Sequence, residues 1–241
     1  MNSLVVEVVP VEGIAVEVIA IDGPGGVGKS TTAKRLAERL GYYFLSSGMI
    51  YRAMAWHLLG QGWRMDAGVP PVERVERDLA ELDVRVIAGG RVLVAGRDVT
   101  EALRDEAVSQ AASVISAVSA VRERSNRVQR DTVAGIGSSG AYPGVVLEGR
   151  DIGTVVFPDA RHKFFLTARE EVRAQRRFAE QGAGNPRANL GAVREALQER
   201  DARDSGRAIA PLVPAPDARI VDTSDLTLEQ VLERILADLK G

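Results

Sequence analysis

The chain has 241 residues, 45% apolar content, no cysteine and a formal net charge of -2 at pH 7. This length and composition suit one α/β domain with a small inserted lobe. The absence of cysteine excludes a disulfide framework, a thiolate metal site and a catalytic thiol. Because the basic residues are spread along a chain without net positive charge, a nucleic-acid partner is not expected.

Residues 1–13 are interpreted as an N-terminal extension, because Pro10 and Gly13 separate them from the next apolar run. Three glutamates interrupt the apolar patches before Ala20, and this region has neither a basic start nor a clear cleavage site. We therefore expect no signal peptide, no membrane partner and a cytoplasmic protein.

The next elements in chain order alternate between strand and helix patterns. The β-branched run 16–21 is typical of a strand buried on both faces of a sheet. Apolar residues at helical spacing then predict a helix over 29–40 that ends at Gly41. Further core strands are predicted at 42–45, 145–148, 163–167 and 218–222, before a closing helix over 226–239. This order predicts an α/β fold with a five-stranded parallel sheet.

A long interruption separates the second and third core strands. Within it, 83–87 and 91–95 flank a glycine pair and predict a hairpin. A helix-rich stretch follows over 100–133, and the Ser/Gly-rich residues 135–144 are expected to return the chain to the sheet. The interruption is too long for a simple crossover, so we predict an inserted lobe over about 75–140 of a domain that spans 14–241.

The string GPGGVGKS, from Gly23 to Ser30, satisfies the phosphate-loop pattern GxxxxGK(S/T) between a predicted buried strand and a predicted helix. Such glycines let backbone N–H groups converge on phosphate oxygens at a helix N-terminus. We expect Lys29 to contact the β and γ phosphates of ATP and the Ser30 hydroxyl to bind Mg²⁺. The alternative is an ordinary glycine-rich turn. The predicted ATP site comprises Gly23, Pro24, Gly25, Gly26, Val27, Gly28, Lys29, Ser30 and Thr31.

A phosphate loop alone does not distinguish switch proteins from kinases. The chain contains no NKxD motif, which argues against a GTPase switch. SSGMIYR follows the second predicted strand and EGRD follows the third, so hydroxyls, carboxylates and arginines gather at the carboxyl edge of the sheet. Ligands of open α/β sheets bind at that edge. For each segment alone, a solvated loop is the alternative.

Together, GPGGVGKST, FLSSGMIYRA, LEGRDIGTVVFPDA and ERDARDSGRAIAPLVPA resemble the bacterial cytidylate kinase family, and the resemblance runs from Val16 onward. It implies a P-loop nucleoside monophosphate kinase core with a CMP-binding insert and a short lid over about 170–187. It also implies a monomer that uses Mg²⁺ and ATP to phosphorylate CMP or dCMP.

The resemblance further implies how the acceptor nucleotide is bound. A carboxylate beside a guanidinium complements the N4 donor and the N3 and O2 acceptors of cytosine. The matching base-reading residues are Ser113, Arg122 and Asp151, those for the monophosphate are Arg52, Arg150 and Arg207, those for the sugar are Arg200 and Asp204, and Ser47 lies close to the nucleotide. One alternative is that Ser113 simply packs in an alanine-rich helix. Another is that Arg200, Asp204 and Arg207 form ion pairs on a surface helix.

Catalysis of phosphoryl transfer depends on neutralising charge, and the resemblance gives this role to four cations. They are Lys29, Arg150, Arg176 and Arg177, with Arg173 as a further lid arginine. A charged, solvated helix is the alternative for the lid, above all for Arg173.

One position departs from the family pattern. Family members usually carry aspartate where this chain has Ser46. The alternatives are that Glu148 or Asp151 takes over the role of this aspartate, or that the aspartate is dispensable. Glu148 ends a predicted buried strand in the manner of a Walker-B carboxylate, so it is the first candidate to contact Mg²⁺ through water.

Two rival functions remain from the sequence. One is a P-loop kinase for another acceptor, such as UMP or a small hydroxy acid. The other is a nucleotide-binding switch with little turnover.

Overall fold

The computed structural model describes residues 16–64, 71–182 and 189–239. The predicted extension 1–13 and the last residues of the predicted lid, 183–187, lie outside these ranges. The chain divides into two compact units: unit 1 comprises Met1–Glu17 and Gly41–Val145, and unit 2 comprises Val18–Leu40 and Val146–Gly241. Among the described residues, no helix combines the length and the apolar character needed to cross a bilayer.

The central sheet follows the predicted strands closely. Its strands are β1 (Glu17–Asp22), β2 (Tyr43–Ser46), β6 (Gly144–Glu148), β7 (His162–Thr167) and β8 (Arg219–Asp222), in the order β2-β6-β1-β7-β8. The pairs β1–β7 and β7–β8 are parallel, with Ile21 opposite Phe164 and Phe165 opposite Ile220. The predicted α/β fold with a five-stranded parallel sheet is confirmed.

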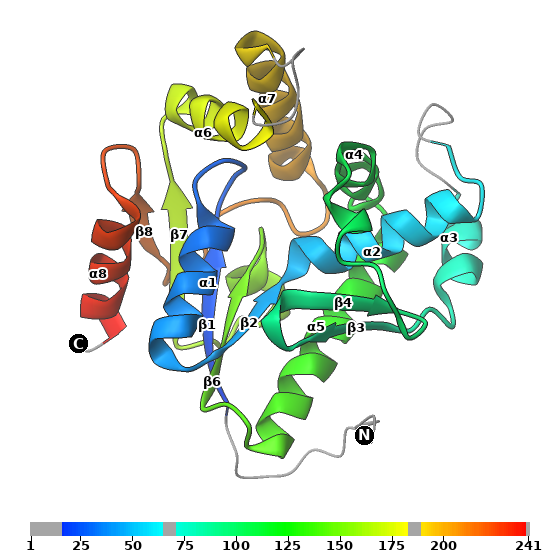
Figure 1. Cartoon of the computed structure of the whole chain (residues 1–241), viewed down its shortest axis with the longest axis horizontal. Coiled ribbons are helices and arrows are strands. Elements are labelled where there is room, and N and C mark those ends of the chain that lie inside the picture. The colour runs from blue at the N-terminus through cyan, green and yellow to red at the C-terminus, as the bar shows by residue number, and fades with distance from the viewer. Residues whose placement is uncertain (1–15, 65–70, 183–188, 240–241) are drawn as a thin grey trace. The chain divides into compact units, whose positions relative to one another are not determined.

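The helices of unit 2 include the predicted helix 29–40, which the structure gives as α1 (Lys29–Leu40). This helix packs against α8 (Leu228–Leu239), through apolar faces that bury Leu36 and Ile235 completely. Figure 1 shows α6 (Glu170–Gly182) and α7 (Leu190–Gly206) side by side beyond the carboxyl end of β7. Their contact is a small apolar cluster of Ala174, Phe178, Val193 and Leu197.

Unit 1 contains the predicted hairpin and the predicted helix-rich stretch. Strands β3 (Val84–Ile87) and β4 (Arg91–Val94) pair in antiparallel fashion around a turn at Ala88–Gly90, and β4 also pairs with a short strand that was not predicted, β5 (Arg97–Asp98). The helices of this unit are α2 (Ser47–Gly60), α3 (Val72–Leu79), α4 (Glu106–Ile115) and α5 (Ser119–Ser139), with a short 3-10 turn at Ala102–Arg104. The helix α2 packs against the other three.

The prediction that residues 135–144 leave the helix is wrong for the first five of these residues, because α5 continues to Ser139. The hydroxyls of Ser138 and Ser139 donate to the carbonyls of Ala134 and Ile136 on the same helix. Their polar groups are therefore satisfied without leaving the helix. The helix ends only at Gly140, whose φ of 61° is the left-handed conformation of a helix C-terminus.

The Gly23→Ala substitution is expected to destabilise the protein. Gly23 has a φ of +144°, and a Cβ there would lie 2.2 Å from the backbone oxygen of Leu166 on β7. Because a strand backbone cannot move aside cheaply, we expect the free energy of unfolding to fall by at least about 2 kcal/mol. Urea denaturation measures this, with Gly206→Ala as the control because its Cβ would meet nothing within 4 Å. Equal effects in the two variants would contradict the prediction.

Candidate functional site

The glycine loop lies between β1 and α1, as predicted. Lys29 begins α1 with only 6% of its surface exposed, and its Nζ donates to the carbonyl of Pro24 at 2.6 Å. Burial, together with the charge of Arg150, lowers the pKa of Lys29 well below its usual value, although Glu148 opposes the shift. A buried ammonium beside another cation is stabilised by an anion, so the loop suits a phosphate group.

Arg173 supports the loop from α6. Its Nη1 donates to the carbonyl of Gly25 at 3.3 Å and forms an ion pair with Asp201 of α7. Asp201 in turn accepts from the backbone N–H of Gly25 at 3.3 Å. The Arg173 side chain is only 12% exposed, so the alternative interpretation of this arginine as solvated is wrong.

Arg176 reaches the loop through Thr223, which follows β8. Its two terminal nitrogens donate to the hydroxyl and the carbonyl of Thr223 at 2.9 and 2.7 Å. The Thr223 hydroxyl lies 3.1 Å from the carbonyl of Val27, to which it donates. Arg177 instead forms an ion pair with Glu180 on its own helix, at 3.3 Å. Of these two predicted lid arginines, the structure thus connects Arg176 to the phosphate loop.

Three arginines surround the carboxylate of Asp204. The nearest nitrogens of Arg150, Arg200 and Arg207 lie 3.0, 3.9 and 3.7 Å from its oxygens. Burial would raise the pKa of Asp204, but the three positive charges outweigh it and lower that pKa. Arg150 comes from outside α7, and the Asp204 side chain is only 5% exposed, so a solvated surface helix does not describe this cluster. Three guanidinium groups thus gather at one buried carboxylate, and planar guanidinium groups bind phosphate oxygens well.

The end of β6 brings further acidic groups to unit 2. Glu148 and Asp151 are both buried, and the N–H of Gly149 donates to the carbonyl of Ile21 at 3.0 Å. Asp22, the last residue of β1, is buried as well. Burial and the charge of Asp151 raise the pKa of Asp22 to about 6, although hydrogen bonds from two backbone N–H groups oppose the shift.

The residues predicted to read the base lie partly in unit 1. Arg122 of α5 is 3% exposed; it donates to the carbonyl of Ser116 at 3.1 Å, and its guanidinium carbon lies 5.9 Å from the centre of the Tyr51 ring. The carbonyl of Ser113 accepts from the Ser116 hydroxyl at 2.8 Å, so Ser113 and Arg122 share one neighbour. The Ser113 hydroxyl oxygen is itself buried and makes no hydrogen bond with any described residue. A buried hydroxyl without a partner is costly, which favours a ligand there.

Two further predicted residues lie on α2. Ser47 begins this helix and is buried. Arg52 lies further along it and donates to the sulfur of Met49 at 3.6 Å. Both predicted residues are therefore placed on an element of unit 1.

The residues predicted to hold Mg²⁺ supply only oxygen. Ser30 is exposed in the first turn of α1, and Glu148 ends β6. The described residues contain no group of three or more His, Cys, Asp or Glu that could hold a metal. This donor set fits Mg²⁺, which usually keeps several waters and binds substrate phosphates rather than a cage of protein ligands.

Sequence reasoning missed three residues that contact the site in unit 2. Asp22 stands directly before the glycine loop, and Thr223 directly after the fifth core strand. Both positions carried a signal, because they lie at the carboxyl edge of the sheet. Asp201 carried none beyond its place in the family-like string ERDARDSGR.

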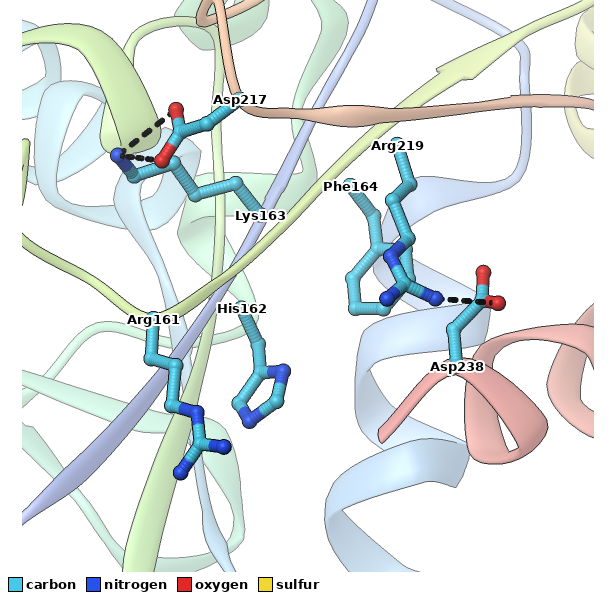
Figure 2. Close-up of a pocket in the computed structure, with 7 residues that line it drawn as sticks. All are labelled: Arg161, His162, Lys163, Phe164, Asp217, Arg219 and Asp238. Atoms are coloured by element: carbon cyan, nitrogen blue, oxygen red, sulfur yellow. Dashed lines mark hydrogen bonds and ion pairs between the residues drawn. The ribbon is translucent and has the colours of Figure 1, made fainter. Parts of the chain in front are cut away.

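A pocket of about 160 Å³ lies at the other end of β7, close to its first residues (Figure 2). Lys163 there forms an ion pair with Asp217 at 2.7 Å, and Arg219 forms one with Asp238. None of the predicted site residues lines this pocket. Lys163 and Arg219 are thus paired with carboxylates, and Arg161 also lines this pocket.

The raised pKa of Asp22 predicts a specific pH dependence of stability. Between about pH 4 and 6 the folded protein keeps the proton and the unfolded chain loses it, so this residue's contribution to stability falls as the pH rises, by about 3 kcal/mol in total. Urea unfolding of wild type and Asp22→Asn at pH 4, 5, 6 and 7 isolates the effect. The difference, wild type minus variant, should decrease across this window, and a constant difference would contradict the prediction.

Comparison with known proteins agrees with these features. The cytidylate kinase family model matches residues 19–241. The cytidylate kinase of Pseudomonas paraeruginosa is 41% identical over 92% of this chain and 94% of its own length. Those of Desulfitobacterium hafniense and Stutzerimonas stutzeri are 42% and 43% identical, over 91% and 93% of this chain and 90% and 95% of their own lengths. The chain belongs to the cytidylate kinase family.

Proposed function

We propose that this protein transfers the γ-phosphoryl group of ATP to CMP or dCMP and releases ADP with CDP or dCDP. The observation that supports this best is the presence in unit 2 of two separate arrangements suited to anions. One is the glycine loop with buried Lys29, and the other is the arginine cluster on Asp204. A kinase with a phosphorylated acceptor needs both.

The donor site consists of the loop residues Gly23 to Thr31. The backbone N–H groups and Lys29 bind the phosphates of ATP, at the N-terminus of α1. Ser30, and Glu148 through water, would hold Mg²⁺, which would supply positive charge beside the phosphates.

The acceptor phosphate is bound by Arg52, Arg150 and Arg207, whose planar groups can each donate two hydrogen bonds to phosphate. Arg200 and Asp204 bind the sugar. A phosphate monoester has lost most of its second proton at neutral pH, so the attacking oxygen needs no general base.

The reaction is a direct displacement. An oxygen of the acceptor 5′-phosphate forms a bond to the γ-phosphorus while the bond from that phosphorus to the β–γ bridging oxygen breaks, and ADP leaves with the bridging oxygen. Lys29, Arg150, Arg176 and Arg177 stabilise the charge that spreads over the transferring group. No covalent enzyme intermediate is involved.

Cytosine is read by Ser113, Arg122 and Asp151, with Ser47 close to the nucleotide. The buried guanidinium of Arg122 and the unpartnered hydroxyl of Ser113 are what support this assignment. Uracil reverses the pattern of donors and acceptors at N3 and at position 4, so it would leave buried groups unpaired. The protein acts as a monomer in the cytoplasm on nucleotides, without a nucleic-acid or membrane partner.

The choice of acceptor is tested by ADP release from purified protein with MgATP. The acceptors are CMP, dCMP, UMP, AMP and GMP, with a blank that contains none. We expect CMP and dCMP to give the highest kcat/KM, by about 100-fold over the purines. A higher value for another acceptor would support the first rival function, and turnover absent from every sample would support a switch protein.

Arg122→Ala is expected to lower kcat/KM for CMP by about 100-fold, because a charged group that binds the base is removed. Arg124→Ala is the matched control: this arginine lies on the same helix but donates to the carbonyl of Leu82, at 2.7 Å. Steady-state kinetics with both variants decide the point. Equal losses would show that α5 is merely disturbed.

Ser113→Ala separates binding from packing. If Ser113 only packs, alanine leaves the KM for CMP unchanged. If its hydroxyl binds the base, alanine raises that KM by about tenfold. In both cases the free energy of unfolding should stay equal or rise by up to about 1 kcal/mol, because a buried hydroxyl without a partner is removed. Kinetics and urea unfolding of the same preparation measure both quantities.

A further inference from the structure

Asp22 is a buried carboxylate to which the proposed function gives no role. It is the last residue of β1, it directly precedes the glycine loop, and it is only 6% exposed. Burial and the negative charge of Asp151 raise the pKa of Asp22, and the positive charge of Lys29 lowers it. A buried carboxylate needs hydrogen-bond donors, and the donors that it has indicate what it does.

Both oxygens of Asp22 accept from one short segment. Oδ1 accepts from the N–H of Ile152 at 2.9 Å, and Oδ2 accepts from the N–H of Gly153 at 2.8 Å. These residues begin the π-helix Ile152–Val156, and the first N–H groups of a helix have no partner within it. Asp22 thus satisfies two donors of this helix from another part of the chain.

The same segment is also tied to β1 on its other side. The N–H of Gly149 donates to the carbonyl of Ile21, so hydrogen bonds from two consecutive residues of β1 hold the backbone before and after residues 150–151. Those two residues are Arg150 and Asp151. They are proposed to bind the acceptor phosphate and the base.

We propose that Asp22 is a positioning residue for the acceptor nucleotide: by accepting from Ile152 and Gly153, it holds the backbone that presents Arg150 and Asp151. The proposal rests on the proposed function, because it concerns the acceptor site of that reaction. It does not make Asp22 a catalytic residue, because its carboxylate is occupied by protein N–H groups.

Gly153 makes the close approach of this segment possible. A Cβ at this position would lie 3.1 Å from Cδ of Lys163 and 3.5 Å from Oδ2 of Asp22. Lys163 thus borders the segment as well, and its ammonium extends to Asp217, as Figure 2 shows. The two contacts differ in kind: Asp22 hydrogen-bonds to the backbone of the segment, whereas the Lys163 stem only packs beside it.

The test compares Asp22→Ala and Asp22→Asn with two controls in the full chain. Asp217→Asn removes the negative charge that pairs with Lys163, whose ammonium also donates to the carbonyl of Pro158, and it keeps the hydrogen bonds of Asp22. Ile235→Ala removes a fully buried side chain of α8 and so destabilises the protein at a distance from the segment. Initial rates are measured with CMP varied at saturating ATP, and then with ATP varied at saturating CMP. Deuterium uptake is measured for a peptide that covers residues 149–156.

We expect Asp22→Ala to raise the KM for CMP at least about tenfold, to change the KM for ATP less than about threefold, and to increase deuterium uptake in the peptide. Asp22→Asn keeps one acceptor oxygen and should recover part of the loss. Neither control should change the KM for CMP by more than about twofold.

Two results would overturn the proposal. One is a change in Asp22→Ala no larger than in Ile235→Ala, and the other is an equal rise in the KM values for CMP and ATP. If Asp22→Ala does not fold, Asp22→Asn decides by the same criteria. If wild type prefers another acceptor, the proposed cytosine specificity fails, and the comparison is made with that acceptor instead; a wild type that uses none overturns both proposals.

Discussion

Asp204 holds three mutually repelling guanidinium groups at one place in unit 2. Arg150, Arg200 and Arg207 would move apart without a common counter-ion. Arg200 and Arg207 lie four and three positions from Asp204 in sequence, whereas the tertiary fold brings in Arg150 from 54 positions away. Their shared carboxylate fixes the directions of the three guanidinium groups before any ligand arrives, which is the preorganisation that an anion site requires.

The phosphate loop depends on contacts of the same kind. Asp201 and Arg173 bind its backbone at Gly25, and Thr223 with Arg176 binds it at Val27. These contacts come from α6, α7 and the end of β8, so the helix that carries the proposed lid arginines is connected directly to the loop. Any displacement of α6 must break hydrogen bonds to the loop backbone, which couples the two elements mechanically.

Much of the fold followed from local patterns. An apolar β-branched run, a glycine loop and an amphipathic helix predicted β1 and α1 because each pattern is set by neighbouring residues. Local composition gave a wrong prediction at the end of α5, because the serine hydroxyls there donate to carbonyls of their own helix. It did not predict β5, because this strand is too short to show a strand pattern.

The site was predictable where a residue stands in a motif. Lys29, Arg150 and Asp204 were identified in this way, and the structure places each beside other charged groups, with Lys29 and Asp204 buried and Arg150 partly buried. The contacts of Asp22 with Ile152 and of Asp201 with Gly25 were not predictable, because they join residues more than 100 positions apart. Pairing of that kind is decided by the tertiary fold and leaves no periodic signal in the sequence.

The hydrogen bond from Lys29 to the carbonyl of Pro24 has a consequence for ligand selection. An ammonium carries three N–H donors, so Lys29 can keep this bond while its other two donors contact an incoming anion, and the bond fixes where those donors point. A small monoanion is bound by these donors alone. A chain of phosphates also engages the backbone N–H groups beyond Lys29, and its gain grows with the number of its oxygens. The loop thus favours polyphosphates over small single anions.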